Sequence, residues 1–181
     1  MHDQLPDPAD NNAKRDDNAL PLADEAATLA LGAALAPLLV PGLKIFLEGD
    51  LGAGKTTLVR GLLRALGHTG KVKSPTYTLV ELYAVSGLNL YHFDFYRFKQ
   101  PEEYLEAGLD EYFQGDAICI VEWPEQAGSY LPGADLRLRL ELLGEGRQAY
   151  LDALTPLGRA RLPCLKTTAT AAAICSNSPP R

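Results

Sequence analysis

The run GDLGAGKT at residues 49–56 constrains the fold of this chain more than any other part of its sequence. It matches the pattern G-x-x-x-x-G-K-[ST], in which glycines let the backbone curl so that successive N–H groups point at phosphate oxygens. The pattern indicates a phosphate-binding loop only when a strand precedes it and a helix follows it. Residues 44–48 form a short apolar run, and apolar side chains recur at helical spacing over residues 58–66. The sequence therefore predicts a phosphate-binding loop at a helix N-terminus.

Two side chains at the end of this run have predicted roles in binding a nucleotide. Lys55 is expected to reach the β- and γ-phosphates, and the hydroxyl of Thr56 is expected to bind a Mg²⁺ ion that bridges them. The residues that the loop offers to the phosphates are Gly49, Asp50, Leu51, Gly52, Ala53, Gly54, Lys55 and Thr56.

The composition sets outer limits on the class of protein. With 181 residues, 46% of them hydrophobic and 22% charged, the chain suits one domain with a sizeable core. A net charge of −6 argues against broad electrostatic binding to nucleic acid or to anionic membranes, although it leaves room for a local basic patch. Cys119, Cys164 and Cys175 show no paired spacing, so neither a disulfide framework nor a zinc site is predicted.

We expect a cytoplasmic location from the same features. No apolar stretch approaches the length of a membrane span, and the N-terminus carries acids and prolines instead of a basic region followed by an apolar one. The sequence therefore predicts no signal peptide and no membrane association.

The chain divides into a predicted domain and two tails. Residues 1–21 are rich in Asp, Asn and Pro, and residues 163–181 are rich in Ala, Thr, Ser and Pro, so both segments are predicted to be disordered. Residues 22–162 form the predicted domain. It begins with an Ala- and Leu-rich stretch over residues 24–39, which predicts a helix packed on the sheet.

The middle and the end of this domain predict mainly strands. Ser86-Gly87 suits a tight hairpin turn, and leucines that alternate with charged residues predict a strand with one buried face. A short helix is predicted at residues 101–108. The predicted strands after the loop cover residues 78–85, 88–94, 117–121, 136–142 and 147–154. This order predicts an α/β fold, a P-loop NTPase-like three-layer sandwich with a mixed parallel and antiparallel sheet.

Two acids stand where a nucleotide-hydrolysing site needs them. Glu122 ends an apolar strand, as a carboxylate does when it is presented beside a metal at the carboxyl edge of a sheet. Asp94 ends another strand and shares a face with Leu90 and His92, while the aromatic residues lie on the opposite face. Solvated strand ends or helix-capping partners are the alternative for both acids. A lone strand histidine is usually scaffolding, so His92 is given no role.

Four motifs in order resemble those of the TsaE family of bacterial ATPases. They are GDLGAGKTT at residues 49–57, KSPTYTLVE at 73–81, YHFDFYR at 91–97 and VEWPE at 121–125. The resemblance spans about residues 22–157. That family takes part in making threonylcarbamoyladenosine on tRNA and works with the TsaB and TsaD proteins.

The resemblance implies a role for each matched residue. Residues 49–57, now including Thr57, would hold ATP, and Glu122 and Asp94 would serve the Mg²⁺ ion or the attacking water. Residues 74–76 would form a switch-like segment in which Thr76 senses the γ-phosphate. Trp123 would lie beside the nucleotide, with a packing role as its alternative. Glu25 would touch the nucleotide from the first helix. The implied catalytic residues are Lys55, Thr76, Asp94 and Glu122, and the implied metal ligands are Thr56, Asp94 and Glu122.

These roles predict a slow ATPase. No arginine is evidently aimed at the γ-phosphate, since Arg97 is more commonly part of a structural ion pair, so hydrolysis is expected to accelerate when TsaB and TsaD complete the site. Contact with tRNA would be only indirect, through that complex. A GTPase is set aside because the chain contains no Asn-Lys-x-Asp and no Asp-x-x-Gly. A small P-loop kinase and a nucleotide-gated assembly factor with little catalysis remain as alternatives.

Overall fold

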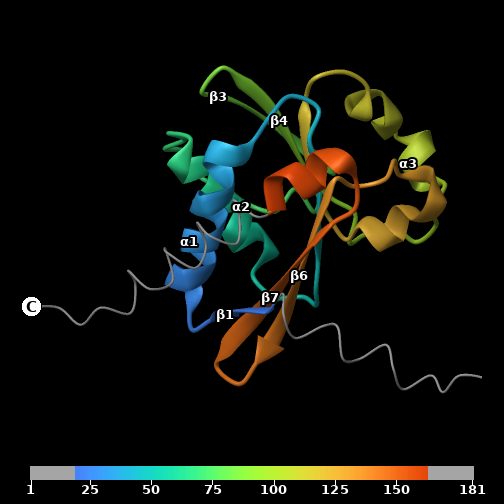
Figure 1. Ribbon diagram of the computed structural model, residues 1–181. Coiled ribbons are helices and arrows are strands. Elements are labelled where there is room, and N and C mark those ends of the chain that lie inside the picture. Colours follow the sequence, from blue (N-terminus) through green and yellow to red (C-terminus); the bar gives the residue numbers. More distant parts are fainter. Residues whose placement is uncertain (1–18, 163–181) are drawn as a thin grey trace, which may run out of the picture.

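The computed structural model describes residues 19–162, which fold around one seven-stranded mixed sheet (Figure 1). The remaining parts of the two predicted tails, residues 1–18 and 163–181, lie outside the described residues. The strand order is β1-β7-β6-β2-β5-β4-β3. The strands are β1 (Ala19–Leu22), β2 (Lys44–Glu48), β3 (Val80–Val85), β4 (Leu88–Asp94), β5 (Ile118–Glu122), β6 (Leu136–Leu143) and β7 (Gly146–Ala153).

The sheet combines a parallel centre with antiparallel edges. Strands β4, β5, β2 and β6 run parallel to one another, whereas β3 pairs with β4, β7 with β6 and β1 with β7 in antiparallel fashion. The pairs β3–β4 and β6–β7 come from short hairpins, β1 and β7 pair although they lie at opposite ends of the domain, and the parallel pairs need longer crossovers. The predicted mixed sheet is therefore confirmed.

Helices cover both faces of the sheet (Figure 1). The two long helices pack together over one face, around a cluster that includes Leu31, Leu58 and Ile120. An aromatic cluster that includes Phe93, Phe95 and Tyr104 lies over the other face. The helical segments are α1 (Glu25–Leu35), η3 (Ala36–Leu38), α2 (Lys55–Ala65), α3 (Glu103–Glu106), η4 (Leu109–Phe113), η5 (Pro124–Tyr130) and a helix over residues 156–162. Within residues 19–162, none of the helices has the length and apolar character needed to cross a membrane.

The first helix is shorter than the sequence predicts. Asp24 caps α1, and its side chain accepts a hydrogen bond from the backbone N–H of Ala27 at 2.8 Å. The α-helix ends at Leu35, and a single 3₁₀ turn that contains Pro37 replaces the last predicted turn. Because proline lacks the N–H that an α-helix needs in its interior, the helical pattern of residues 24–39 overstates its length.

Strand β4 shows the predicted alternation of its two faces. Leu90 packs into the cluster beneath the long helices, whereas Phe93 and Phe95 belong to the aromatic cluster on the opposite side. A central strand of a covered sheet buries both faces, so His92 and Asp94 are buried polar groups. Such groups need partners, and they find them at the carboxyl edge of the sheet.

The N-terminal boundary of the fold differs from the predicted one. Residues 19–21 were assigned to the disordered tail, but they lie in β1, where Ala19 is aligned with Tyr150 and Leu22 with Arg147 of β7. An edge strand is held by backbone hydrogen bonds to its neighbour, and these do not require an apolar pattern. The 3₁₀ segments η4 and η5 were not predicted either, because short 3₁₀ turns have no hydrophobic period of their own.

Candidate functional site

The site forms at one edge of the sheet, where three parallel strands end. The register of β4 and β5 places Asp94 directly beside Glu122. Strand β2 lies next to β5 and leads into the loop at residues 49–54, after which α2 begins at Lys55. The crevice outside the carboxyl ends of parallel strands is the usual ligand site of α/β folds. The geometry thus brings the loop and both predicted acids together.

The loop has the backbone conformation that its glycines make possible. Gly49, Gly52 and Gly54 have φ values of 140°, 82° and 104°, which side-chain-bearing residues rarely adopt. A Cβ atom on Gly49 would also collide with the carbonyl oxygen of Leu140. Gly54 is the residue before α2, and no side chain caps this helix, so its first N–H groups remain available. The loop therefore offers backbone donors and a positive dipole end to an anion.

Lys55 carries its charge into the centre of this loop. Its Nζ atom donates to the carbonyl oxygen of Asp50 at 2.9 Å and also to that of Gly49, and it lies 4.3 Å from the ring centroid of Trp123. The residue is only 4% exposed. Burial lowers the pKa of the Lys55 amine from its ordinary value, while Glu122 and Asp94 act in the opposite direction. A poorly hydrated cation of this kind interacts strongly with an anion that enters the loop.

Glu122 joins the loop helix to strand β4 through one carboxylate oxygen. Its Oε1 accepts a hydrogen bond from Oγ1 of Thr56 at 2.8 Å and lies 2.8 Å from Nε2 of His92. Glu122 and His92 are both buried. The hydroxyl of Thr56 donates its proton here, so its oxygen lone pairs remain available to a cation.

Asp94 is held by the segment at residues 74–76. Its Oδ2 accepts hydrogen bonds from Oγ1 of Thr76 at 3.2 Å and from the hydroxyl of Ser74, and these two hydroxyls lie 2.8 Å apart. Its Oδ1 accepts a hydrogen bond from the backbone N–H of Tyr96 at 2.9 Å. The structure thus couples the predicted switch-like segment directly to a predicted metal ligand or water-binding acid.

Most of the predicted site residues line a single pocket of about 290 Å³. The loop residues Gly49 and Asp50 contribute the carbonyl oxygens that bind Lys55, and Ala53 is buried beneath the loop. The predicted residues that line the pocket are Leu51, Gly52, Gly54, Lys55, Thr56, Thr57, Thr76, Asp94, Glu122 and Trp123.

Glu25 is the predicted site residue that the structure does not bring to this pocket. It occupies the first turn of α1, where its side chain is 66% exposed and its Oε1 lies 3.7 Å from Arg60 of α2. Thr28, one turn further along α1, is the residue of this helix that contacts Arg147 and lies next to Gly54. The contact between Glu25 and a nucleotide has no support in this geometry.

An arginine that the sequence did not reveal also lines the pocket. Arg147 of β7 lies against Gly54, and its NH1 atom donates to Oγ1 of Thr28 at 3.4 Å. Its Nε is buried and has no hydrogen-bond partner within residues 19–162. Arg97, the weak candidate from the sequence, instead stacks over the ring of Tyr77 at 4.0 Å. The sequence could not predict this position, because Arg147 lies in the hairpin of β6 and β7, which reaches the loop only through the pairing of β6 with β2.

The oxygen ligands at the site fit a magnesium ion that arrives with phosphates. Thr56, Glu122 and Asp94 offer a hydroxyl and two carboxylates, which are ligand types that Mg²⁺ prefers. In the described part of the chain, no group of three or more His, Cys, Asp or Glu side chains is placed to hold a metal by itself. Mg²⁺ in nucleotide sites usually keeps waters and takes only one or two carboxylates, so this donor set matches that use.

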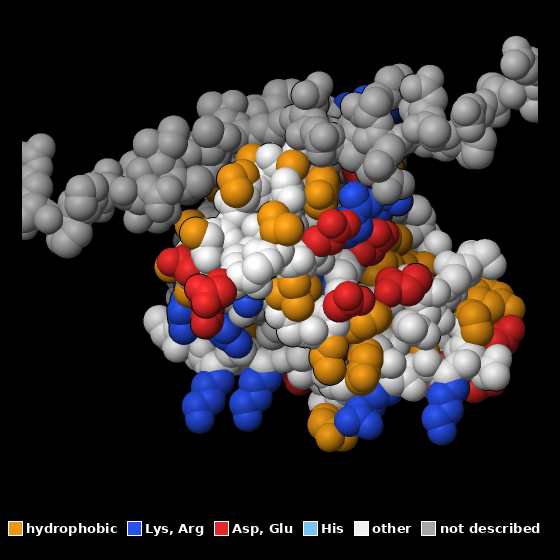
Figure 2. All heavy atoms as spheres, turned by 90° about the horizontal axis from the view of Figure 1, so that it is seen from below, with side chains coloured by type: hydrophobic (Ala, Val, Ile, Leu, Met, Phe, Trp, Pro, Cys, Tyr) orange, Lys and Arg blue, Asp and Glu red, His pale blue; other side chains and the backbone are white. Residues whose placement is uncertain are grey.

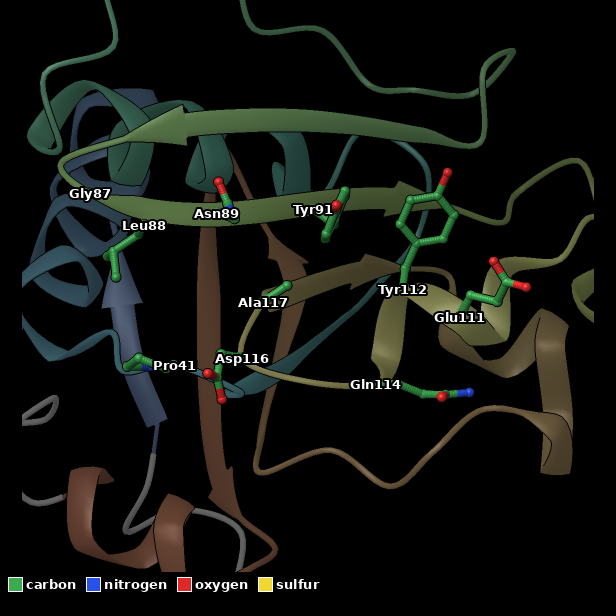
Figure 3. A pocket seen from close by; sticks show the side chains of 10 residues that line it. All are labelled: Pro41, Gly87, Leu88, Asn89, Tyr91, Glu111, Tyr112, Gln114, Asp116 and Ala117. Atoms are coloured by element: carbon green, nitrogen blue, oxygen red, sulfur yellow. The ribbon is translucent and has the colours of Figure 1, made fainter.

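A second pocket, of about 570 Å³, lies at the opposite edge of the sheet (Figure 3). Its lining includes Leu88 at the start of β4 and Ala117 just before β5, and Tyr112 and Glu111 lie beside them. None of its lining residues belongs to the loop, to the switch-like segment or to the pair of acids. Its larger volume therefore does not make it the candidate site.

Three comparisons with known proteins agree with one another. The family model for "Threonylcarbamoyl adenosine biosynthesis protein TsaE" matches residues 22–149. The "tRNA threonylcarbamoyladenosine biosynthesis protein TsaE" of Haemophilus influenzae is 45% identical over 141 residues, which cover 75% of this chain and 89% of that protein. The protein of the same name from Bacillus subtilis is 42% identical over 118 residues, or 65% of this chain and 73% of that protein. The crystal structure of Bacillus subtilis YdiB matches with a TM-score of 0.65 and 30% identity, and the match covers 88% of this chain and 95% of that one.

Proposed function

Since the chain belongs to the TsaE family of threonylcarbamoyladenosine biosynthesis proteins, we propose that it binds and hydrolyses ATP with Mg²⁺ in support of this tRNA modification. One observation carries the proposal. The ammonium of Lys55, the hydroxyl of Thr56 and the carboxylate of Glu122 converge on one pocket at the mouth of a glycine loop. This is the arrangement that phosphoryl transfer requires for positioning and for neutralising charge.

Each residue contributes a distinct part of the proposed reaction. The backbone N–H groups of the loop and Lys55 bind the phosphate oxygens, and Arg147 adds a second cation on the side of Gly54. Thr56 and Glu122 would hold a Mg²⁺ ion, which would neutralise part of the phosphate charge. Asp94 orients the attacking water from its place beside Glu122. The chain needs no covalent intermediate for this chemistry.

Trp123 offers a direct optical test of where the nucleotide binds. It is the only tryptophan in the chain, it lines the pocket, and its ring lies 4.3 Å from Nζ of Lys55. We expect its fluorescence to change saturably when ATP is added to the wild-type protein, because a phosphate that attracts Lys55 alters the surroundings of the indole ring. The same titration of Lys55→Ala is expected to show a much weaker response. An unchanged emission spectrum in the wild type would place the nucleotide elsewhere.

We further propose that TsaB and TsaD accelerate the reaction and that tRNA is reached only through them. The bonds from Ser74 and Thr76 to Asp94 support coupling, because a partner that moves this segment also moves the acid. The net charge is −6, and the face seen in Figure 2 mixes basic with acidic side chains, which does not favour direct tRNA binding.

The experiment compares turnover of the purified chain with turnover in the presence of TsaB and TsaD. We expect a faster rate with both partners and little effect of tRNA on the chain alone. Equal rates with and without the partners would contradict the proposal. A single-turnover measurement followed together with partner release separates this ATPase from an assembly factor, in which hydrolysis would only reset binding and each hydrolysis event would be accompanied by partner release.

A further inference from the structure

His92 is a fully buried side chain with one polar partner. It lies in the middle of β4, and its residue is 0% exposed. Its Nε2 is 2.8 Å from Oε1 of Glu122, and its Nδ1 has no hydrogen-bond partner within residues 19–162. A buried imidazole costs least when its proton sits on the nitrogen that has an acceptor, and a buried N–H without an acceptor is among the rarest polar groups in proteins. The contacts therefore favour a proton on Nε2, where it meets an acceptor.

The two donors to Glu122 act on the same oxygen. Thr56 and His92 both reach Oε1, while no described residue donates a hydrogen bond to Oε2. Glu122 nevertheless lines the pocket, so its second oxygen is the one left for a ligand. A carboxylate fixed at one oxygen by two hydrogen bonds has lost most of its freedom to rotate, and the direction of the other oxygen is set.

The register of β4 and β5 places His92 within hydrogen-bonding distance of Glu122. His92 is aligned with Ile120 on the neighbouring strand, and Glu122 lies two positions further along on the same face of β5. The imidazole therefore reaches the carboxylate diagonally across two strands. An apolar side chain of similar size in the same place would bury a similar surface but would leave Oε1 with Thr56 alone.

We propose that His92 is the positioning residue of Glu122: it donates from Nε2 to Oε1 and thereby directs Oε2 into the nucleotide pocket. The inference rests on the proposed function of Glu122, but the hydrogen bond itself is a property of the protein without nucleotide. His92 touches neither nucleotide nor metal and acts only through the acid. Precise placement matters because a misplacement of about 1 Å in an active site can cost about 100-fold in rate.

Two substitutions separate the hydrogen bond from the volume that it occupies. His92→Gln keeps an N–H donor near the position of Nε2, whereas His92→Leu keeps a similar size without a donor. His68→Gln and His68→Leu are the matched controls, because His68 follows α2 at the end opposite the loop and packs against Tyr83. Thermal unfolding is recorded for all four variants.

The first readout is the imidazole nitrogen spectrum of the ¹⁵N-labelled protein without nucleotide. The His92 signals, assigned by their loss in His92→Gln, are expected to show a proton on Nε2. A ring protonated at Nδ1 alone would overturn the proposal whatever the protein does with ATP.

The second readout is single-turnover hydrolysis with Mg²⁺ at saturating and subsaturating ATP. We expect His92→Leu to lower the rate roughly 10- to 100-fold with little change in the ATP concentration at half-saturation, and His92→Gln to recover most of the loss. Equal loss in both variants, or no loss in a folded His92→Leu, would overturn the proposal. A wild-type protein that binds no ATP would refute the proposed function instead, and the nitrogen spectrum would still decide the role of His92.

Discussion

Replacing Lys55 with alanine is expected to lower ATP hydrolysis by about 100-fold or more, since it removes the only lysine ammonium that lines the pocket within residues 19–162. The fold should survive. Within the described residues, the buried amine donates hydrogen bonds only to carbonyl oxygens of the loop. Its loss therefore breaks no hydrogen bond to a buried carboxylate, and Glu122 keeps its hydrogen bond from Thr56. Single-turnover hydrolysis at saturating ATP measures the loss, with Lys99→Ala on an exposed segment as the control. Full activity in Lys55→Ala would remove Lys55 from the mechanism.

The same substitution has a consequence for stability that depends on pH. Because burial lowers the pKa of the Lys55 amine, the folded protein releases this proton at a lower pH than the unfolded chain does. The unfolded state then holds more protons between the lowered pKa and the ordinary value of 10.5, and stability gains from this group as the pH rises through that window. Wild type is therefore expected to gain stability relative to Lys55→Ala between neutral and alkaline pH in urea unfolding.

Replacing Gly32 with valine is expected to destabilise the fold by about 3 kcal/mol or to prevent folding. A Cβ atom on Gly32 of α1 would collide with the backbone carbonyl of Leu58 in α2, and a Cβ atom on Gly61 would collide with the carbonyl of Leu29. The two helices pack backbone to backbone at these glycines, so no side chain can move to make room. The backbone must therefore move, which would separate α2, the helix after the phosphate loop, from α1.

Urea unfolding of Gly32→Val measures this effect against Gly133→Val. A Cβ atom on Gly133 meets open space, and the residue does not adopt a positive φ. We expect the control to remain close to the wild-type midpoint. A Gly32→Val variant as stable as Gly133→Val would mean that the helix pair is not packed as closely as the structure places it.

The local parts of this site could be predicted from the sequence. The loop at residues 49–56 is a contiguous pattern, and Asp94 and Glu122 each end an apolar strand, so one-dimensional periodicity places all of them at strand ends. The two faces of β4 followed from the same period of two. What these predictions share is that each depends on residues close together in the chain.

The remaining parts depend on contacts between distant segments. Arg147 reaches the loop only because β6 pairs with β2, and His92 reaches Glu122 only because β4 and β5 pair in one register. The period of two in one strand predicts which face each side chain lies on, but it does not predict which residue of the neighbouring strand is aligned with it. Glu25 lies away from the pocket for a related reason, since the packing of α1 on α2 decides which of the side chains of α1 face the site.

Isothermal titration calorimetry of the purified chain with Mg-ATP tests the central claim most directly. The claim is that the backbone of residues 49–54, Lys55, Thr56 and Glu122 form one nucleotide site. We expect a saturable heat that corresponds to one ATP per chain and a strongly reduced heat for Lys55→Ala. The absence of any heat with the wild-type protein, at several temperatures, would contradict the account.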